Sequence, residues 1–231
     1  MRRDPRARAE PVPGPDQAAP RKHDKVACDM TAQHWDQLFR TQDTDQVSWH
    51  QETHHTSLAL IADIPGSVID VGAGSSTLVD ELLTTGRTDL TVLDISEAAL
   101  ELTRRRLGHR AGLVSFEVAD ITTWAPHRAY EVWHDRAVFH FLTHAADQAG
   151  YVELVTRAIS PGGALVLGTF AEDGPTHCSG LPTARYSAES AADRFSRAFD
   201  LEHHIRETHQ TPAGTEQPFT WVVLRRRRSA R

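Results

Sequence analysis

The sequence is poor in the residues that several classes of protein require. It has two cysteines, Cys28 and Cys178, too few for a disulfide framework, which favours a reducing compartment. No apolar run approaches the roughly 20 residues that cross a bilayer. The N-terminus starts basic, but proline-rich residues 11–15 stand where a secretion signal would be apolar. We therefore expect a cytoplasmic protein without membrane contact.

Lysine is nearly absent. Lys22 and Lys25 are the only lysines among 25 basic residues, and the formal net charge is −6. An acidic chain without a basic, aromatic-rich groove offers little for nucleic acid to bind, so we expect no such partner. A chain of 231 residues is long enough for one α/β domain with a full core. Composition says nothing about the oligomeric state.

The two ends of the chain differ from its centre. Residues 1–27 are rich in Pro, Arg and Ala and lack hydrophobic periodicity, which predicts a disordered arm. Residues 28–66 are predicted as a helical segment, in which Thr31 caps a first helix and Pro65 follows a second one at 57–64. Residues 67–225 form the predicted core, and residues 226–231 a basic tail.

Within the core, apolar strands alternate with helices. We predict strands at 68–71, 90–94, 113–118, 130–134 and 164–169, with helices at 75–83, from Ser96 to Gly108, at 147–159 and at 187–199. Residues 201–209 and 219–224 are predicted to form a final antiparallel pair. This pattern is typical of a doubly wound, Rossmann-like α/β fold with a mostly parallel sheet.

A glycine turn between two apolar strands is the most informative motif. Gly72 and Gly74 allow the backbone to approach a ligand closely, because no Cβ blocks it. Asp94 ends the next strand about twenty residues later, where an acid can bind the two hydroxyls of a ribose. The pair predicts a cofactor that contains a nucleoside.

Two cofactors fit such a unit. Nicotinamide dinucleotides favour a third glycine, where this chain has Thr77, and a pyrophosphate that Asp70 would repel. Asp70 could instead pair with a cationic amino group. S-adenosyl-L-methionine, which joins a ribose to an amino-acid tail, suits these charges better. A nicotinamide oxidoreductase remains the disfavoured alternative.

Five motifs, in order, resemble those of the class I S-adenosylmethionine-dependent methyltransferases, which have a seven-stranded core. They are residues 70–74, Asp94-Ile95, residues 118–121, residues 130–135 and residues 161–167. The resemblance implies S-adenosyl-L-methionine as cofactor and an acid that holds the ribose. The cofactor-binding residues that we predict are Asp70, Gly72, Ala73, Gly74, Asp94, Ile95, Asp120, Ile121, Asp135, Trp35 and Phe39.

Further runs resemble a group of small bacterial methyltransferases. Residues 135–138 resemble the D-R-G-A motif of thiopurine-type methyltransferases, which indicates a small thiol or other heteroatom acceptor. The region around Trp35 is more similar to elongation-factor lysine methyltransferases, which indicates a protein lysine. In both, the segment before the first strand closes the site, so Trp35 and Phe39 are either an aromatic lid or simply core. A non-catalytic cofactor-binding module is a third alternative.

The chain is dense in histidine after the fourth predicted strand. His134, Asp135 and His140 stand where substrate binds in such a sheet, and histidine is the commonest general base. We take these three as the catalytic candidates. The alternative is that the histidines are packed or surface residues. Methyl transfer requires no metal, and we predict no metal site.

Overall fold

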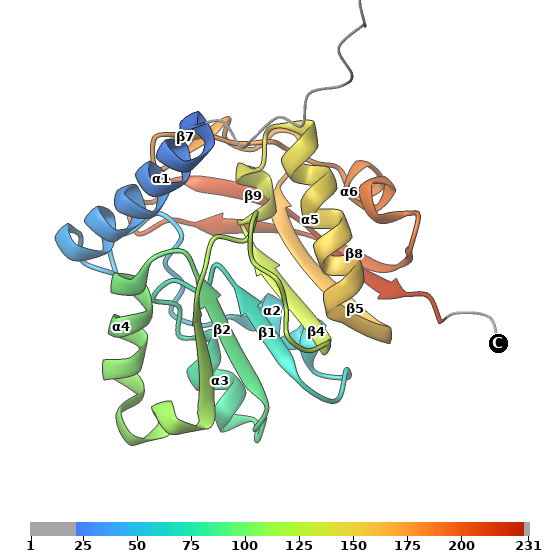
Figure 1. Ribbon diagram of the computed structural model, residues 1–231, viewed down its shortest axis with the longest axis horizontal. Coiled ribbons are helices and arrows are strands. Elements are labelled where there is room, and N and C mark those ends of the chain that lie inside the picture. Colours follow the sequence, from blue (N-terminus) through green and yellow to red (C-terminus); the bar gives the residue numbers. More distant parts are fainter. Residues whose placement is uncertain (1–21, 229–231) are drawn as a thin grey trace, which may run out of the picture.

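The computed structural model describes residues 22–228, and the side chains of residues 32–228. Its centre is a seven-stranded sheet with the strand order β3-β2-β1-β4-β5-β9-β8 (Figure 1). The strands are β1 Val68–Val71, β2 Leu90–Asp94, β3 Val114–Val118, β4 Tyr130–Arg136, β5 Ile159–Phe170, β8 Phe199–Gln210 and β9 Glu216–Arg226. β1 to β5 are parallel, and β9 is antiparallel to both of its neighbours. The predicted fold class is confirmed.

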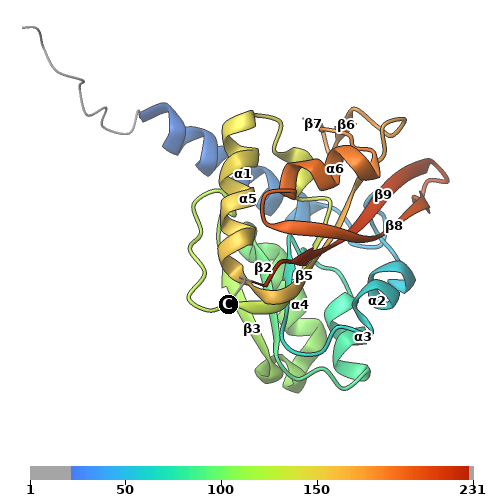
Figure 2. The ribbon, with the colours of Figure 1, turned by 90° about the vertical axis from the view of Figure 1, so that its right-hand side faces the viewer.

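Helices cover both faces of the sheet (Figure 2). They are α1 Lys22–Thr41, α2 His55–Ile61, α3 Leu78–Thr84, α4 Glu97–Leu107, α5 Ala145–Ala158 and α6 Ala188–Phe195, with short 3₁₀ helices at Gly108–Leu113 (η1) and Phe139–Phe141 (η2). Apolar residues of α3 and α4 pack in one core cluster and those of α5 and α6 in the other. The two clusters place the helix layers on opposite sides of the sheet.

The central strands divide their side chains between these two clusters. Val68 of β1 packs in the cluster with α3 and α4, whereas Ile69 and Val71 pack in the cluster with α5 and α6. Every residue of β1 and of β2 is buried. Near-continuous apolar runs are what a parallel strand covered on both faces requires, which explains why the sequence shows little alternation here.

The N-terminal boundary differs from the prediction. α1 begins at Lys22, so residues 22–27 belong to a helix and not to the predicted arm, and Thr31 lies inside the helix and does not cap it. The remainder of that arm, residues 1–21, and residues 229–231 of the predicted basic tail lie outside the described residues. Within residues 22–228, no helix combines the length and the apolarity that a bilayer crossing requires.

Two strand boundaries also differ. β5 starts at Ile159 and not at the predicted residue 164, because residues 159–163 are taken into the strand beside a register shift in the pairing with β4. The loop after β5 contains an unpredicted hairpin of β6, His177–Cys178, and β7, Leu181–Pro182. Its turn has positive φ at Ser179 and Gly180, as a two-residue hairpin turn favours.

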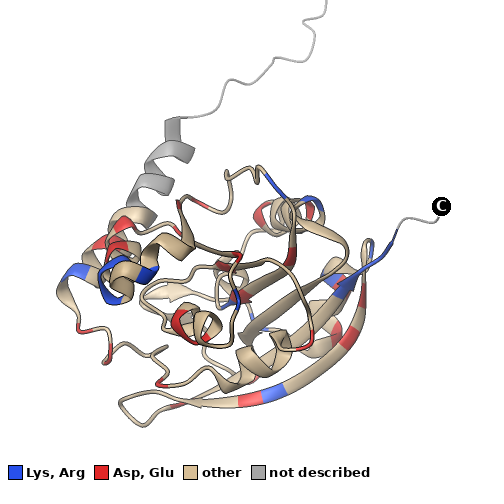
Figure 3. Ribbon diagram, turned by 90° about the horizontal axis from the view of Figure 1, so that it is seen from below, with Lys and Arg blue, Asp and Glu red and all other residues tan. Residues whose placement is uncertain are grey.

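The arginines that end β9 are bound to acids of the neighbouring strand. Arg225 pairs with Glu202 at 2.6 Å, and Arg227 pairs with Asp200 at 3.1 Å. Figure 3 shows this basic end beside acidic positions of β8. Of the predicted tail, Arg226 therefore belongs to β9, and Arg227 is bound to β8 by an ion pair just beyond the strand end.

We expect substitution by alanine to change the stability of the fold in opposite directions at two glycines. A Cβ on Gly168 of β5 would lie 2.9 Å from ring carbons of the buried Trp221, whereas one on Gly150, exposed in α5, would contact nothing within 4 Å. We expect Gly168→Ala to destabilise the fold by about 2 kcal/mol through overpacking. Gly150→Ala should stabilise it by about 0.5–1 kcal/mol through helix propensity.

Thermal and urea unfolding of the two variants would check this pair. A chain of this size should shift its melting temperature by about 2–4 °C per kcal/mol. Equal stability of Gly168→Ala and the wild type would contradict the tight packing of β5 against Trp221.

Candidate functional site

A cavity of about 760 Å³ lies at the carboxyl ends of the parallel strands. Loops that follow β1, β2, β3 and β4 line it, together with the end of α1 and the segment after α1. Ligands bind at this edge in open α/β sheets. The structure brings to this cavity all but one of the predicted cofactor-binding residues: Asp70, Gly72, Ala73, Gly74, Asp94, Ile95, Asp120, Ile121, Trp35 and Phe39.

The glycine turn is held tightly against its surroundings. Gly72 and Gly74 have φ values of 65° and 54°. A Cβ on Gly72 would lie 2.0 Å from Val138, and one on Gly74 would lie 3.1 Å from Phe39. Both glycines are therefore required by conformation and by space. The turn exposes backbone, without side chains, to the cavity.

Asp94 binds the turn from the neighbouring strand. One carboxylate oxygen accepts a hydrogen bond from the backbone N–H of Gly74 and the other from that of Ser96, each at 2.8 Å. Burial raises the pKa of Asp94 to about 6, although these two N–H groups act in the opposite direction. Each oxygen of a carboxylate keeps a second lone pair, so Asp94 can still accept from a ligand.

Asp120 lies at the far side of the same edge. Its Oδ1 accepts hydrogen bonds from the backbone N–H of Thr122, at 2.9 Å, and from the Thr122 hydroxyl, at 2.8 Å. The neighbouring Ile121 is buried. A carboxylate and an apolar side chain thus stand together in the cavity wall after β3.

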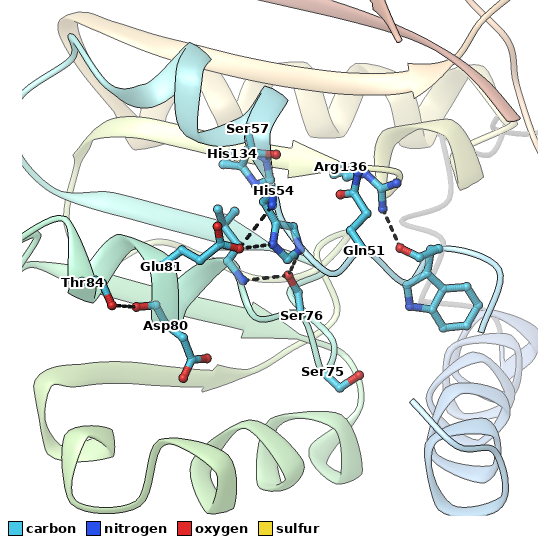
Figure 4. Close-up of polar contacts among 12 residues, drawn as sticks. Gln51, His54, Ser57, Ser75, Ser76, Asp80, Glu81, Thr84, His134 and Arg136 are labelled. Carbon is cyan, nitrogen blue, oxygen red and sulfur yellow. Dashed lines mark hydrogen bonds and ion pairs between the residues drawn. The ribbon is translucent and has the colours of Figure 1, made fainter. Parts of the chain in front are cut away.

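Asp70 and His134, which both line the cavity, form a buried polar chain with Ser57. Figure 4 shows His134 beside Ser57. His134 Nδ1 lies 2.7 Å from Asp70 Oδ1, and Nε2 lies 2.9 Å from the Ser57 hydroxyl. Since the carboxylate only accepts, Nδ1 carries the proton. Both ring nitrogens are thus occupied within the fold, which makes His134 a positioning residue for Asp70.

The sequence did not predict a second buried series of hydrogen bonds, which joins His54, Glu81 and Ser76. His54 Nδ1 lies 2.6 Å from Glu81 Oε1, and Nε2 lies 2.9 Å from the Ser76 hydroxyl (Figure 4). Burial lowers the pKa of His54, and Glu81 only partly offsets this. A neutral imidazole therefore links α2 and α3 to the end of the glycine turn. The three residues come from separate segments without a common motif, so spacing gave no signal.

Asp135 is the predicted cofactor-binding residue that lies outside the cavity. Its carboxylate accepts from the backbone N–H groups of Val138, at 2.8 Å, and Phe139, at 3.1 Å, and from the Tyr151 hydroxyl. Burial raises its pKa to about 6, and the Tyr151 hydroxyl opposes this most. The structure thus corrects the predicted catalytic and cofactor-binding role: Asp135 holds the loop after β4 in place.

His140 also lies outside the cavity. Its ring is fully buried, with the rings of Phe141 and Phe170 centred 4.5 Å away, and neither nitrogen has a hydrogen-bond partner among the described residues. Burial, with a smaller effect of Arg136, lowers its pKa to about 3. His140 is neutral at physiological pH and does not line the cavity, so it is no candidate for a general base.

The predicted lid residues form an aromatic cluster over the cavity. The ring centroids of Trp35 and Trp49 are 5.8 Å apart, those of Trp35 and Phe141 5.5 Å, and those of Phe39 and Trp49 6.1 Å. Asp36 fixes α1 in this position, because it accepts from the Ser96 hydroxyl at 2.6 Å. The aromatic residues are thus packed together and line the cavity at the same time.

The loop after β4 contains a strained residue. Ala137 has a φ of 78° and stands where the D-R-G-A motif has glycine. A positive φ costs an L-residue roughly 1–2 kcal/mol. Its N–H donates to Gly168 O at 2.8 Å, which holds the turn. The preceding Arg136 donates to the carbonyl oxygen of Trp49 at 3.0 Å.

The thiol of Cys178 and the guanidinium of Arg136 also line the cavity. Cys178 of β6 faces the cavity, and burial raises the pKa of its thiol. Among residues 22–228 there is no group of three His, Cys, Asp or Glu side chains that would hold a metal ion. The cavity wall therefore offers backbone, carboxylates, aromatic rings, one thiol, one guanidinium and the imidazoles of His50, His54, His134 and His144.

Comparison with known proteins identifies a methyltransferase domain within the chain. Residues 68–163 match the family model described as a methyltransferase domain. No curated protein is significantly similar in sequence.

Solved structures match over most of the chain. The N-methyltransferase NodS from Bradyrhizobium japonicum, in complex with S-adenosyl-L-homocysteine, has a TM-score of 0.67 at 17% identity and covers 85% of this chain and 98% of its own. A 1,6-didemethyltoxoflavin-N1-methyltransferase from Burkholderia thailandensis has a TM-score of 0.67 at 18% identity, covering 94% of each. A structure from work on the conversion of a disulfide bond into a thioacetal group during echinomycin biosynthesis has a TM-score of 0.68 at 20% identity, covering 86% and 94%.

At these identities the structural likeness shows a shared fold. Residues 68–163 therefore form a methyltransferase domain, and the chain has the fold of the class I S-adenosylmethionine-dependent methyltransferases. S-adenosyl-L-methionine is its cofactor. The expectations of an enzyme and of this cofactor are confirmed.

The position of Asp135 predicts a loss of stability on its removal. Asp135→Ala would leave the buried N–H of Phe139 and the Tyr151 hydroxyl without their acceptor, which should cost about 3 kcal/mol. Tyr151→Phe removes a hydroxyl that donates to Asp135 and accepts from Trp133 Nε1, and it should cost about 2 kcal/mol. Urea unfolding measures both. A fully stable Asp135→Ala variant with lost turnover would instead restore the catalytic role.

Proposed function

We propose that this enzyme transfers the methyl group to a sulfur, nitrogen or oxygen atom of a small molecule that binds in the same cavity as the cofactor. The observation that carries the proposal is the single cavity of about 760 Å³, which is lined by cofactor-type residues on one side and by aromatic, thiol and guanidinium groups on the other. Its volume is in the range of small-molecule sites.

The residues after β1, β2 and β3 fit the cofactor. Asp94, fixed by two backbone N–H groups, would accept the ribose hydroxyls, and Asp70, held by His134, would face the amino group of the amino-acid tail. Asp120 and Ile121 would flank the adenine. A Cβ at Gly72 would collide with Val138 and one at Gly74 would press against Phe39, so the two glycines let these side chains pack closely against the turn. These assignments follow the motif resemblance, and the geometry of each side chain is compatible with them.

The remaining lining fits a second, smaller ligand. Trp49 and Phe141 form an apolar wall, and Cys178 and Leu181 of the β6–β7 hairpin form another. The cofactor supplies a methyl group on a positively charged sulfur, which is reactive toward any well-placed lone pair. The chain then has to orient the acceptor and exclude water. A thiolate or a free amine needs no general base for this.

Two of the similar structures are named for N-methylation, and one of these names a small molecule, 1,6-didemethyltoxoflavin. This supports a small-molecule acceptor for the present chain. Methylation of a protein lysine is the outcome that would replace it, since a lysine side chain also reaches a buried methyl donor through an apolar channel.

Incubation of the enzyme with methyl-labelled S-adenosyl-L-methionine and a cell extract distinguishes a small-molecule acceptor from a protein lysine. The extract is divided by filtration into small molecules and proteins. We expect label in the small-molecule fraction. Label confined to the protein fraction would contradict the proposal and establish the protein-lysine alternative, and cofactor binding without transfer to either fraction would indicate a non-catalytic module.

A variant of Asp94 tests whether this carboxylate binds the ribose of the cofactor. Asp94→Asn should weaken binding of S-adenosyl-L-homocysteine tenfold or more, because a charged acceptor of two hydroxyls is lost. Asp89, which precedes β2 at the opposite edge of the sheet and pairs with Arg128, is the control. Asp89→Asn should bind with wild-type affinity. Equal affinity of the two variants would contradict the ribose assignment.

The pH dependence of binding tests the same carboxylate. The pKa of Asp94 is about 6, and ribose hydroxyls bind the ionised form. The dissociation constant of S-adenosyl-L-homocysteine should be constant above about pH 7. It should rise as the pH falls through 6, toward tenfold per pH unit, because protonation competes with binding. Calorimetry at pH 5 to 8 measures this, and an unchanged break in Asp94→Asn would assign it to another group.

A further inference from the structure

Arg106 of α4 holds the end of the glycine turn from outside the cavity. Its Nη1 donates to the carbonyl oxygen of Ser75 at 2.7 Å, and its Nη2 donates to the carbonyl oxygen of Ser76 at 2.6 Å. Ser75 and Ser76 line the cavity, whereas Arg106 does not. The planar guanidinium thus spans two consecutive carbonyl groups, a contact that the single ammonium of a lysine cannot reproduce.

The guanidinium of Arg106 is itself fixed by an acid. Asp80 of α3 accepts from Arg106 Nε at 2.9 Å and, through its other oxygen, from Arg110 Nη2 at 2.8 Å. All three nitrogens of the Arg106 guanidinium therefore have a partner in the protein. A network of this kind fixes the direction of a side chain better than an isolated surface pair does. Arg106 acts on the cavity through the turn and not by contact with a ligand.

The carbonyl group of Gly74 is turned in the same direction. Thr103, a buried residue one helical turn before Arg106, donates its hydroxyl to the carbonyl oxygen of Gly74 at 3.2 Å. Three consecutive carbonyl oxygens, those of residues 74–76, thus bind α4. Because neither Thr103 nor Arg106 lines the cavity, these oxygens point away from it. In a trans peptide the N–H lies opposite the C=O, so the N–H ends of these peptide groups are turned toward the cavity side.

The hydroxyl of Ser76 gives the turn a second attachment. It lies 2.9 Å from His54 Nε2, and Figure 4 shows it directed toward that ring. It also accepts from the backbone N–H of Leu78 at 3.1 Å. These contacts do not involve α4. They keep the turn in place without Arg106, so removal of Arg106 releases two carbonyl groups and not the whole turn.

The order of the strands indicates which part of the cofactor lies beside this turn. β3, β2 and β1 are neighbours in that order. In the proposed arrangement the adenine lies at Asp120 after β3, and the ribose lies at Asp94 after β2. The amino-acid tail, which continues from the ribose, then lies beside the turn after β1. Its ammonium would face Asp70. Its carboxylate is attracted by peptide N–H groups and repelled by carbonyl oxygens.

We propose that Arg106 is a positioning residue for the amino-acid tail of S-adenosyl-L-methionine. It holds the carbonyl groups of Ser75 and Ser76 away from the cavity, so the turn presents the N–H ends of its peptide groups to the tail carboxylate. Without Arg106, these carbonyl groups are free to turn toward the carboxylate and repel it. This inference rests on the cofactor orientation of the proposed function and adds a residue from outside the cavity to that site.

Two ligands that differ only in the tail test the proposal. S-adenosyl-L-homocysteine carries the whole amino-acid tail, whereas 5′-methylthioadenosine has the same adenine, ribose and sulfur and ends in a methyl group. Arg106→Met should weaken binding of S-adenosyl-L-homocysteine at least about tenfold, and that of 5′-methylthioadenosine less than about twofold. Calorimetry measures both affinities. Damage to the whole fold would weaken both ligands, so the ratio of the two affinities separates a positioning role from a structural one.

Three further variants separate the contacts of this network. Arg106→Lys keeps the charge and the pairing with Asp80, so α3 and α4 stay linked, but lysine cannot span two carbonyl oxygens. It should lose most of the affinity for S-adenosyl-L-homocysteine, and it decides the test if Arg106→Met does not fold. Arg105→Met, on the same helix and paired with Glu101 at 3.2 Å, is the matched control. Arg110→Met removes the other partner of Asp80. Both of these variants should keep the wild-type ratio of affinities.

Three results would overturn the proposal. One is an equal loss of both ligands in Arg106→Met, which would give Arg106 a structural role. Another is an unchanged affinity of that variant for S-adenosyl-L-homocysteine. The third is wild-type binding of S-adenosyl-L-homocysteine by Arg106→Lys, which would assign the effect to the charge at residue 106 and not to the direction of the carbonyl groups.

The outcome is distinct from failure of the proposed function, because the test contains no methyl acceptor. Failure of the proposed acceptor appears as label in the protein fraction of the extract, or as no transfer, and leaves both affinities unchanged. Asp94→Asn checks the cofactor orientation: loss of the ribose contact should weaken both ligands to the same extent. Selective loss of S-adenosyl-L-homocysteine in Asp94→Asn would contradict that orientation, and the proposal for Arg106 with it.

Discussion

The hydrogen bonds between the carboxylate of Asp94 and the backbone of two turns hold the site together. The N–H of Gly74, after β1, and that of Ser96, after β2, both end on this side chain. Two adjacent strand ends are thereby fixed to one buried carboxylate, and the conformation of the glycine turn depends on it. Burial raises the pKa of Asp94 and so disfavours its charged form, whereas the two N–H donors act in the opposite direction and favour the carboxylate.

Around this centre, each wall of the cavity is fixed by a polar contact behind it. His134 holds Asp70, and His54 ties the end of the glycine turn to Glu81. Asp135 holds the loop that carries Val138 against Gly72. Hydrogen bonds from behind keep the cavity-lining residues rigid. Methyl transfer requires this rigidity, because the two ligands must be held in a fixed orientation. The packing of Phe39 against Gly74 adds the helix α1 to the same unit.

The sequence was sufficient for the parts that depend on local pattern. The glycine turn, the acid after β2 and the order of strands follow from spacing and apolar runs, and the structure brings those residues to one edge. It was insufficient where roles depend on side-chain direction. Asp135 and Asp70 both stand near strand ends, yet one lines the cavity and the other accepts bonds from its own loop. His140 follows a strand tip as a catalytic residue would, but it is buried between rings. Arg106 belongs to no motif, and its contacts with the glycine turn are visible only when its neighbours in space are known.

The strand at one edge of the sheet, β8, affects how readily the protein can associate with further copies of itself. β8 is twelve residues long and unpaired on one side, and such edges invite pairing with another chain. This edge is protected by a register shift between Leu201 and His203 and by charged side chains, including Arg206, which is bound to Asp173. An irregular, charged edge is a poor template for an added strand, so the sheet of this enzyme resists growth into aggregates from its most exposed side.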